Sequence, residues 1–368
     1  MSSSSKAVAK SIWAVIGGGN GGQSAAGHLG ILGFPVRIYD IFEETIGEIR
    51  SKGGVEVGGA VQGFGPVQLA TTSIDQAVDG ADVIMIIAPA LAHRDIARSL
   101  APFVRPGQIV FIHPGATFGA IEFYREFTSA GAPVDDLVIC EAQSLLYACR
   151  SVSPGVVSIK GVKQKLAVSA LPAVKTAAAV ASLAAAFPQI VPGINVLETG
   201  LTNLNAMMHP GPSLLNTSLI ESSHEWKYYL DGITPTIGVF VERLDKERLA
   251  LGKAVGLELH GILEMYREMY GVHAPTLSET VRKNPAYQDI QGQKKVDTRY
   301  ILEDIPMGLV PMASLARKLG VPCRMMETII SLGEEVLDRD LTTTGRTLES
   351  LGLAGMSLAG LLDFVEGH

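Results

Sequence analysis

A glycine-rich loop between a short apolar run and a small-residue segment constrains this chain more than any other feature. The run Ser11 to Ile16 (SIWAVI) is rich in β-branched and aromatic residues and predicts a buried strand. The loop Gly17 to Gly22 follows, and a helical pattern then runs from Gln23 to Leu32. Glycines spaced as G-x-G-x-x-G between a strand and a helix let the diphosphate of a dinucleotide approach the helix N-terminus. The loop therefore predicts a dinucleotide site.

The loop residues and an acid beyond them indicate which dinucleotide is bound. Asp40 ends a second predicted strand, Pro35 to Tyr39, and lies roughly 20 positions beyond the loop, where an acid that binds ribose hydroxyls is expected. Its carboxylate would accept hydrogen bonds from the ribose of NAD and repel the 2′-phosphate of NADP. We therefore expect NAD rather than NADP. The expected cofactor contacts are Gly17, Gly19, Asn20, Gly21, Gly22 and Asp40.

Unbroken apolar runs then repeat along the first half of the chain, at Ala81 to Ala88, Gln108 to Ile112 and Leu137 to Cys140. Helical patterns separate them, at Ala92 to Leu100 and Gly119 to Thr128. Continuous apolar strands alternating with helices are typical of a parallel sheet covered on both faces. We predict a doubly wound, Rossmann-type α/β domain.

The ligand contacts of such a domain lie at the carboxyl ends of its strands. Pro89 and Pro114 follow two predicted strands, so both are further candidate cofactor contacts. The stretch Ser158 to Leu171 predicts another strand pair, and the alanine-rich Ala173 to Phe187 predicts a helix that closes the domain. The predicted boundary divides the chain into residues 1–190 and 191–368.

The second half shows helical periodicity instead. Val241 and Leu244 fall on one face of a segment whose other face contains Glu242 and Asp245, and Gly256 ends it. Similar amphipathic stretches follow, so residues 191–368 are predicted to form an all-α domain that holds the substrate and a proton carrier.

Composition excludes several other classes of protein. A length of 368 residues fits about two domains, and a net charge of −7 argues against nucleic acid as a partner. No apolar run approaches the ~20 residues that span a bilayer, which argues against a membrane protein. The first ten residues lack the apolar core of a secretory signal, so we expect a frayed tail and a cytoplasmic protein. Three irregularly spaced cysteines predict neither disulfides nor a metal site, and base rates favour a homodimer.

Two polar segments stand out in the predicted helical domain, Asn203 to Pro210 and Asp297 to Pro306. His209 lies in the first, among apolar residues. A histidine can give and take a proton near neutral pH, and a carboxylate can orient it. Spacing alone leaves two interpretations open: a proton carrier, or a buried core or interface histidine.

These motifs together resemble the NAD/NADP octopine and nopaline dehydrogenase family, the opine dehydrogenases, and especially the branch of bacterial N-(1-carboxyethyl)-norvaline dehydrogenases. The resemblance runs nearly end to end. It rests on the glycine loop and on the following segments in the same order: His113 to Ala116, Ala148 to Arg150, Asn203 to Pro210, Tyr228 to Pro235, Asn284 to Tyr287, Thr298 to Asp304 and Gly345 to Leu348.

The resemblance implies a reductive condensation. A 2-oxo acid, expected to be pyruvate, and the amine of an amino acid form an imine, to which NADH delivers hydride. The positions that match the family's His-Asp pair are His209, as proton carrier, and Asp304, as the carboxylate that orients it. Arg299 is implied to grip a substrate carboxylate with its planar guanidinium.

Further substrate contacts are expected on both halves of the chain. Arg150 is a second candidate for carboxylate binding, with a structural ion pair beneath the sheet as its alternative. Gln143 stands near the end of a strand where family members often have a Glu-Thr pair. The apolar candidates for an uncharged, hydrophobic amine partner are Met207, Met208, Trp226 and Tyr229, each of which could instead belong to the core.

Two other functions remain as alternatives. One is a ketopantoate- or glycerol-phosphate-type dehydrogenase that reduces a carbonyl, but such enzymes usually need a lysine that neither polar segment contains. The other is a non-catalytic NAD-binding sensor, which would have no use for His209, Arg299 and Asp304 together.

Overall fold

The computed structural model describes residues 10–367, so most of the predicted N-terminal tail lies outside the described residues. The chain forms two compact units. The first consists of residues up to 114, 126–170 and 175–192, and the second of residues 115–125, 171–174 and 193 onward.

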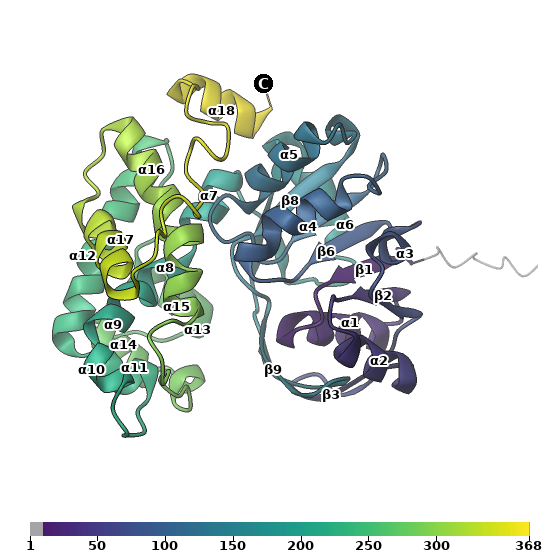
Figure 1. Ribbon diagram of the computed structural model, residues 1–368, viewed down its shortest axis with the longest axis horizontal. Helices are drawn as coiled ribbons and strands as arrows, with labels where there is room; N and C mark the ends of the chain where they lie inside the picture. The colour runs from purple at the N-terminus through teal and green to yellow at the C-terminus, as the bar shows by residue number, and fades with distance from the viewer. Residues whose placement is uncertain (1–9, 368) are drawn as a thin grey trace, which may run out of the picture. The chain divides into compact units, whose positions relative to one another are not determined.

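The first unit contains an eight-stranded sheet in the order β12-β11-β8-β7-β6-β1-β2-β5. Its strands β1, β2, β6 and β8 are labelled in Figure 1. β1 pairs in parallel with β2 and β6, β6 with β7, and β7 with β8. The run from β5 to β8 has the strand order of a dinucleotide-binding fold, which confirms the predicted Rossmann-type domain. The strands are β1 (Trp13–Ile16), β2 (Val36–Tyr39), β5 (Leu69–Thr71), β6 (Val83–Ile86), β7 (Ile109–Ile112), β8 (Val138–Ala142), β11 (Leu166–Leu171) and β12 (Ile190–Pro192).

Helices lie between these strands in the chain, where the sequence changes from continuous apolar runs to helical patterns. The central strand β1 is fully buried, and Trp13 packs edge-on against Phe34 and Phe187. The helices are α1 (Asn20–Ile31), α2 (Glu43–Lys52), α3 (Ile74–Val78), α4 (His93–Leu100), α5 (Gly119–Ser129) and α6 (Thr176–Leu183), with short 3₁₀ turns η1 (Ala90–Ala92), η2 (Val134–Asp136) and η3 (Ala173–Lys175). Residues 119–125 of α5 belong to the second unit.

The sequence did not predict a second sheet in the first unit. It is four-stranded, in the order β4-β3-β10-β9, with β3 (Gly54–Gly59), β4 (Gly63–Pro66), β9 (Tyr147–Ser153) and β10 (Val156–Val162). The predicted strand pair at Ser158 to Leu171 is therefore divided, with β10 in this sheet and β11 in the large one. Small residues on α1 permit this packing, because a Cβ at Gly27 would lie 2.5 Å from Val57 and one at Gly30 would lie 2.6 Å from the Pro66 carbonyl.

The second unit is helical, as the sequence predicts (Figure 1). Among its described residues, β-structure is limited to an isolated bridge between Lys227 and Gln291. The helices are α7 (Val196–Leu201), α8 (Leu204–Met208), α9 (Pro210–Leu215), α10 (Thr217–Ile220), α11 (Tyr228–Gly232), α12 (Pro235–Ala254), α13 (Ile262–Tyr270), α14 (Leu277–Lys283), α15 (Arg299–Leu302), α16 (Val310–Leu319), α17 (Arg324–Leu337) and α18 (Leu358–Glu366), with a 3₁₀ turn η4 (Pro285–Tyr287) and a π-helical turn η5 (Ile305–Leu309).

The prediction for one residue of α12 is wrong. Asp245 was expected on the polar side, but it is buried. Its carboxylate accepts hydrogen bonds from Arg248 Nε at 2.7 Å and from the Ile262 backbone N–H at 2.8 Å. A buried carboxylate is tolerated when its oxygens are paired in this way, so periodicity alone misplaced it.

In the described part of the chain, no helix is long and apolar enough to cross a membrane.

Candidate active site

The glycine loop of the first unit has the geometry of a phosphate-binding turn. Gly17 has a φ of +116°, and its N–H donates to the Tyr39 carbonyl at 2.8 Å. A Cβ at Gly22 would lie 1.7 Å from the Gly17 carbonyl oxygen, so only glycine lets α1 start this close to the turn. A Cβ at Gly19, in contrast, would meet no atom within 4 Å. The loop thus leaves open space before the first N–H groups of α1, which fits a diphosphate.

Asp40 lies at the end of β2, beside this loop. One carboxylate oxygen accepts from the Gly18 N–H and the other accepts from the Phe42 N–H at 3.0 Å. Each oxygen keeps a lone pair for a ribose hydroxyl. Arg37 donates instead to the backbone carbonyl of Asp79, so its guanidinium is engaged away from Asp40.

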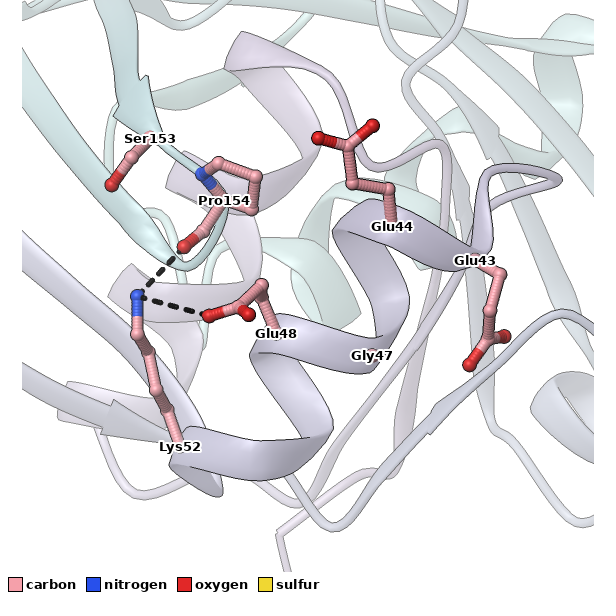
Figure 2. Close-up of a pocket in the computed structure, with 7 residues that line it drawn as sticks. All are labelled: Glu43, Glu44, Gly47, Glu48, Lys52, Ser153 and Pro154. Atoms are coloured by element: carbon pink, nitrogen blue, oxygen red, sulfur yellow. Dashed lines mark hydrogen bonds and ion pairs between the residues drawn. The ribbon is translucent and has the colours of Figure 1, made fainter.

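A surface pocket of about 560 Å³ lies along α2, just after Asp40 in the chain (Figure 2). Its lining carries three carboxylates and one lysine. Lys52 donates to the Pro154 carbonyl at 2.8 Å and lies 3.9 Å from a Glu48 oxygen. The lining of this pocket is therefore acidic overall. The lining residues are Glu43, Glu44, Gly47, Glu48, Lys52, Ser153 and Pro154.

The remaining predicted cofactor residues lie along the same edge of the sheet. Asn20 starts α1, and its Oδ1 accepts from the Ser151 N–H at 2.9 Å, so this side chain holds β9 to the loop. A Cβ at Gly21 would clash with Ile87 at 2.7 Å, which makes Gly21 a packing residue as well. Pro89 follows β6 and is exposed, whereas Pro114 follows β7 and is partly buried.

In the second unit, the structure brings His209 and Asp304 together. His209 lies between α8 and α9, with its N–H bonded to the Asn205 carbonyl at 3.0 Å and Pro210 at the first position of α9. Its Nδ1 lies 2.7 Å from Oδ2 of Asp304, and both residues are buried. Asp304 directly precedes the π-helical turn η5, a type of distortion frequent at functional sites.

Burial and the hydrogen bond with His209 act in opposite directions on the Asp304 carboxyl group. Burial raises the pKa of Asp304 above its usual range, while the hydrogen bond from His209 opposes that rise. A carboxylate at Nδ1 fixes that nitrogen as the N–H donor and leaves Nε2 to exchange a proton.

Aromatic residues surround the imidazole of His209. Nε2 of His209 lies 3.2 Å from the hydroxyl of Tyr229, and burial raises the pKa of that phenol well above its usual value, so it stays protonated. Tyr300 stacks on the imidazole with ring centroids 3.9 Å apart and an interplanar angle of 12°. Tyr228 bonds the His209 carbonyl at 2.9 Å. Together these contacts set the plane and position of the imidazole.

Arg299 lies at the start of α15, five residues before Asp304. Its Nε donates to Glu303, and its side chain is 71% exposed. Within residues 10–367, neither terminal nitrogen of the guanidinium has a protein acceptor. This pair of donors is free for a bidentate contact with a carboxylate.

The other predicted substrate residues differ in their surroundings. Arg150 is exposed on β9, which does not support the alternative of an ion pair beneath the sheet. Gln143 follows β8 and is partly buried, with its N–H bonded to the Ala167 carbonyl. Met207, Met208, Trp226 and Tyr229 are all buried, and the Trp226 indole donates to the Gln293 carbonyl at 3.1 Å.

Sequence reasoning missed Tyr300 as the stacking partner of His209 and missed a buried ion pair in the second unit. Arg346 and Glu122 are almost fully buried and lie 2.9 Å apart. Arg346 also donates to the carbonyls of Gly115 and Thr117, which holds that segment to the helical unit. The segment Gly345 to Leu348 was visible only as a resemblance, because the partner of Arg346 is more than 200 positions away.

One group of side chains in the described residues has ligand atoms close enough for a metal ion. His260, Glu264 and Glu268 are all exposed, and His260 Nδ1 lies 2.8 Å from a Glu268 oxygen. The group is on and before α13, away in sequence from the predicted catalytic residues.

Comparisons with known proteins show which family and fold the chain resembles. The family model described as "NAD/NADP octopine/nopaline dehydrogenase, alpha-helical domain" matches residues 192–337. The opine dehydrogenase of Arthrobacter sp. (strain 1C) is 41% identical over 355 residues, which cover 96% of this chain and 98% of that protein. An octopine dehydrogenase in complex with NADH and agmatine has a TM-score of 0.78 at 20% identity, with 98% of each chain covered. An octopine dehydrogenase structure with NADH and pyruvate has a TM-score of 0.78 at 19% identity and the same coverage.

Proposed function

Because the chain belongs to the opine dehydrogenase family, and is thus an NAD-dependent oxidoreductase, we propose that it joins a 2-oxo acid to the amino group of an amino acid and reduces the product to a secondary amine. The proposed oxo acid is pyruvate, the ligand named for one octopine dehydrogenase structure. The proposed amine partner is a hydrophobic amino acid, with Met207, Met208 and Trp226, all buried in this structure, as its candidate apolar contacts.

The buried pair of His209 and Asp304 carries this proposal. The condensation first releases water: the amine adds to the oxo carbon, and the resulting carbinolamine loses its hydroxyl as water to leave a protonated imine. His209 Nε2–H gives the proton to that leaving oxygen. Asp304 stabilises the imidazolium through Nδ1, and Tyr300 keeps the ring in plane.

Reduction needs hydride at the imine carbon, and NADH supplies it when bound. In the reverse direction, neutral His209 accepts a proton at Nε2 from the protonated secondary amine, and the neutral amine then gives up its hydride. Tyr229 remains protonated and lies 3.2 Å from Nε2, so it positions the reacting group or the imidazole and is not itself a base. Arg299 binds a substrate carboxylate through its two free terminal nitrogens.

The residues of the first unit fit NAD. Open space at Gly19 accommodates the diphosphate and Asp40 accepts from the ribose hydroxyls. The cofactor, substrate and catalytic contacts of all the site residues stay predictions, including those of Pro89, Pro114, Gln143 and Arg150, as do the homodimer and the cytoplasmic location.

NADH oxidation distinguishes this function from its alternatives. We expect no appreciable oxidation with pyruvate alone or with an amino acid alone, and rapid oxidation when pyruvate is combined with the correct amino acid. A panel should compare hydrophobic, acidic and basic amino acids at equal concentration, with product mass confirming a secondary amine dicarboxylate. Reduction of pyruvate alone as fast as the mixture would show a carbonyl reductase instead.

A further inference from the structure

Lys163 is a charged group that the proposed mechanism does not use. It follows β10 in the first unit, and its Nζ donates to Ser144 Oγ at 2.6 Å. Over the described range of residues, Nζ has no other protein acceptor and no carboxylate partner. Burial lowers its pKa to about 8, yet the residue keeps partial exposure. Burying an ammonium group whose N–H donors lack acceptors costs free energy unless a ligand accepts those hydrogen bonds.

The backbone fixes Lys163 at the carboxyl edge of the large sheet. Its N–H donates to the Leu146 carbonyl at 3.0 Å, and the Leu146 N–H donates to Nε2 of His113 at 2.8 Å. His113 directly follows β7, and Ser144 lies two residues after β8. Ligands of open parallel sheets bind at this edge.

The same cluster adjoins the glycine loop. Leu145 follows Ser144, and a Cβ placed on Gly21 would be 3.3 Å from its side chain. Lys163 is therefore bonded to a segment, Gln143 to Leu145, that reaches the glycine loop through Leu145 and includes Gln143, which was predicted to touch substrate.

The donors of this cluster exceed its acceptors. Ser144 Oγ accepts from Lys163, so its own O–H can donate elsewhere, and Lys163 has two more N–H groups. His113 is neutral, because burial and then the charge of Lys163 lower its pKa to about 3, so it neither offsets nor adds to the charge. Among the described residues, His113 is the titratable group whose pKa the charge of Lys163 lowers. A cation and a hydroxyl that can both still donate hydrogen bonds form a binding site for an oxyanion.

We propose that Lys163, together with Ser144, binds an anionic oxygen group of a ligand at the carboxyl edge of the sheet, either the carboxylate of the 2-oxo acid or the diphosphate of the cofactor. The choice of these two sources rests on the proposed function. The oxyanion chemistry is common to both, and the experiment separates them.

Equilibrium binding tests the proposal without turnover. Lys163→Met removes the charge while keeping much of the side-chain length, and Lys165→Met is the matched control because Lys165 is exposed two residues away. NADH affinity is measured by fluorescence titration, and the affinity of the NADH complex for oxamate, a non-reacting mimic of a 2-oxo acid, by calorimetry. Loss of one charge-assisted hydrogen bond weakens binding by about 10- to 100-fold.

Each result then has a defined meaning. Weaker oxamate binding with normal NADH binding assigns the substrate carboxylate, and weaker NADH binding assigns the diphosphate. Lys163→Arg should recover part of the affinity. Values within twofold of wild type for both ligands would overturn the proposal.

The pH dependence of the wild-type protein covers the case in which Lys163→Met does not fold. Binding of the anionic ligand should weaken as pH rises through about 8, since Lys163 loses its charge there. Lys163→Arg should flatten that dependence, and a flat wild-type profile between pH 6.5 and 9.5 would also overturn the proposal. A folded protein that binds both ligands but condenses no amine would refute the proposed function and leave this inference standing.

Discussion

Replacing Asp304 with Asn is the most direct test of how the His209 imidazole is used. The substitution keeps the shape of the side chain but removes the charge that lies 2.7 Å from Nδ1. An imidazolium formed during the reaction then loses a buried counter-charge. The amide can also turn its NH₂ toward Nδ1, which would place the ring proton on Nε2 and leave no acceptor there.

The size of the effect follows from the geometry. A hydrogen bond between charged groups contributes about 1.5–3 kcal/mol net. The Coulomb energy of two unit charges about 4 Å apart is about 4 kcal/mol at an effective dielectric constant near 20. Because about 1.4 kcal/mol corresponds to a tenfold change in rate, kcat of Asp304→Asn should fall by about 10- to 1000-fold. NADH affinity should not change, since Asp304 belongs to the helical unit.

Steady-state NADH oxidation at saturating substrates gives kcat, and fluorescence titration gives the NADH Kd. Asp245→Asn is the matched control, because Asp245 is a buried aspartate of the same unit whose partner is Arg248. That control should lower Tm without a comparable loss of kcat per folded molecule. A folded Asp304→Asn protein with kcat within threefold of wild type would refute the role given to the pair.

Three further predictions concern other parts of the molecule. Asp40→Ser should shift the ratio of NADP to NAD activity upward by about tenfold, measured as kcat/KM for each cofactor, and an unchanged ratio would mean that another group binds the ribose. Arg299→Lys should raise KM for a carboxylate substrate by about tenfold, the equivalent of one charge-assisted hydrogen bond, with the NADH Kd unaffected; an unaltered KM would remove Arg299 from substrate binding. Arg346→Met removes the buried charge paired with Glu122 and should lower the free energy of unfolding by about 3–5 kcal/mol. In a thermal melt this corresponds to a Tm decrease of roughly 6–20 °C. The control Arg317→Met, which breaks an exposed ion pair, should change Tm by only a few degrees.

Much of the first unit could be predicted from sequence because its signals are local. A buried parallel strand is an unbroken apolar run, and the turn after β1 requires glycine at Gly17 and Gly22 for steric reasons within a few residues. The acid at the end of β2 follows from the same short-range pattern. The four-stranded sheet was missed because β3 and β10 pair across about a hundred residues, and nothing in either strand indicates its partner.

The helical unit shows the same division. Periodicity predicts its helices. The same local pattern placed Asp245 on the polar face of α12, although the structure buries it. Burial of Asp245 depends on Arg248 and on a backbone N–H from the next helix, which periodicity does not contain.

By itself, the sequence determined that a dinucleotide loop with a ribose-binding acid precedes a helical half, because strand, turn and helix propensities act over a few neighbouring residues. It also carried the resemblance that singled out His209 and Asp304. Only the tertiary structure decided that these two side chains, 95 positions apart, meet at 2.7 Å, that Tyr300 stacks on the ring, and that Lys163 reaches the strand ends. Such contacts depend on the packing of distant elements, whose geometry is set by the whole core and not by any local segment.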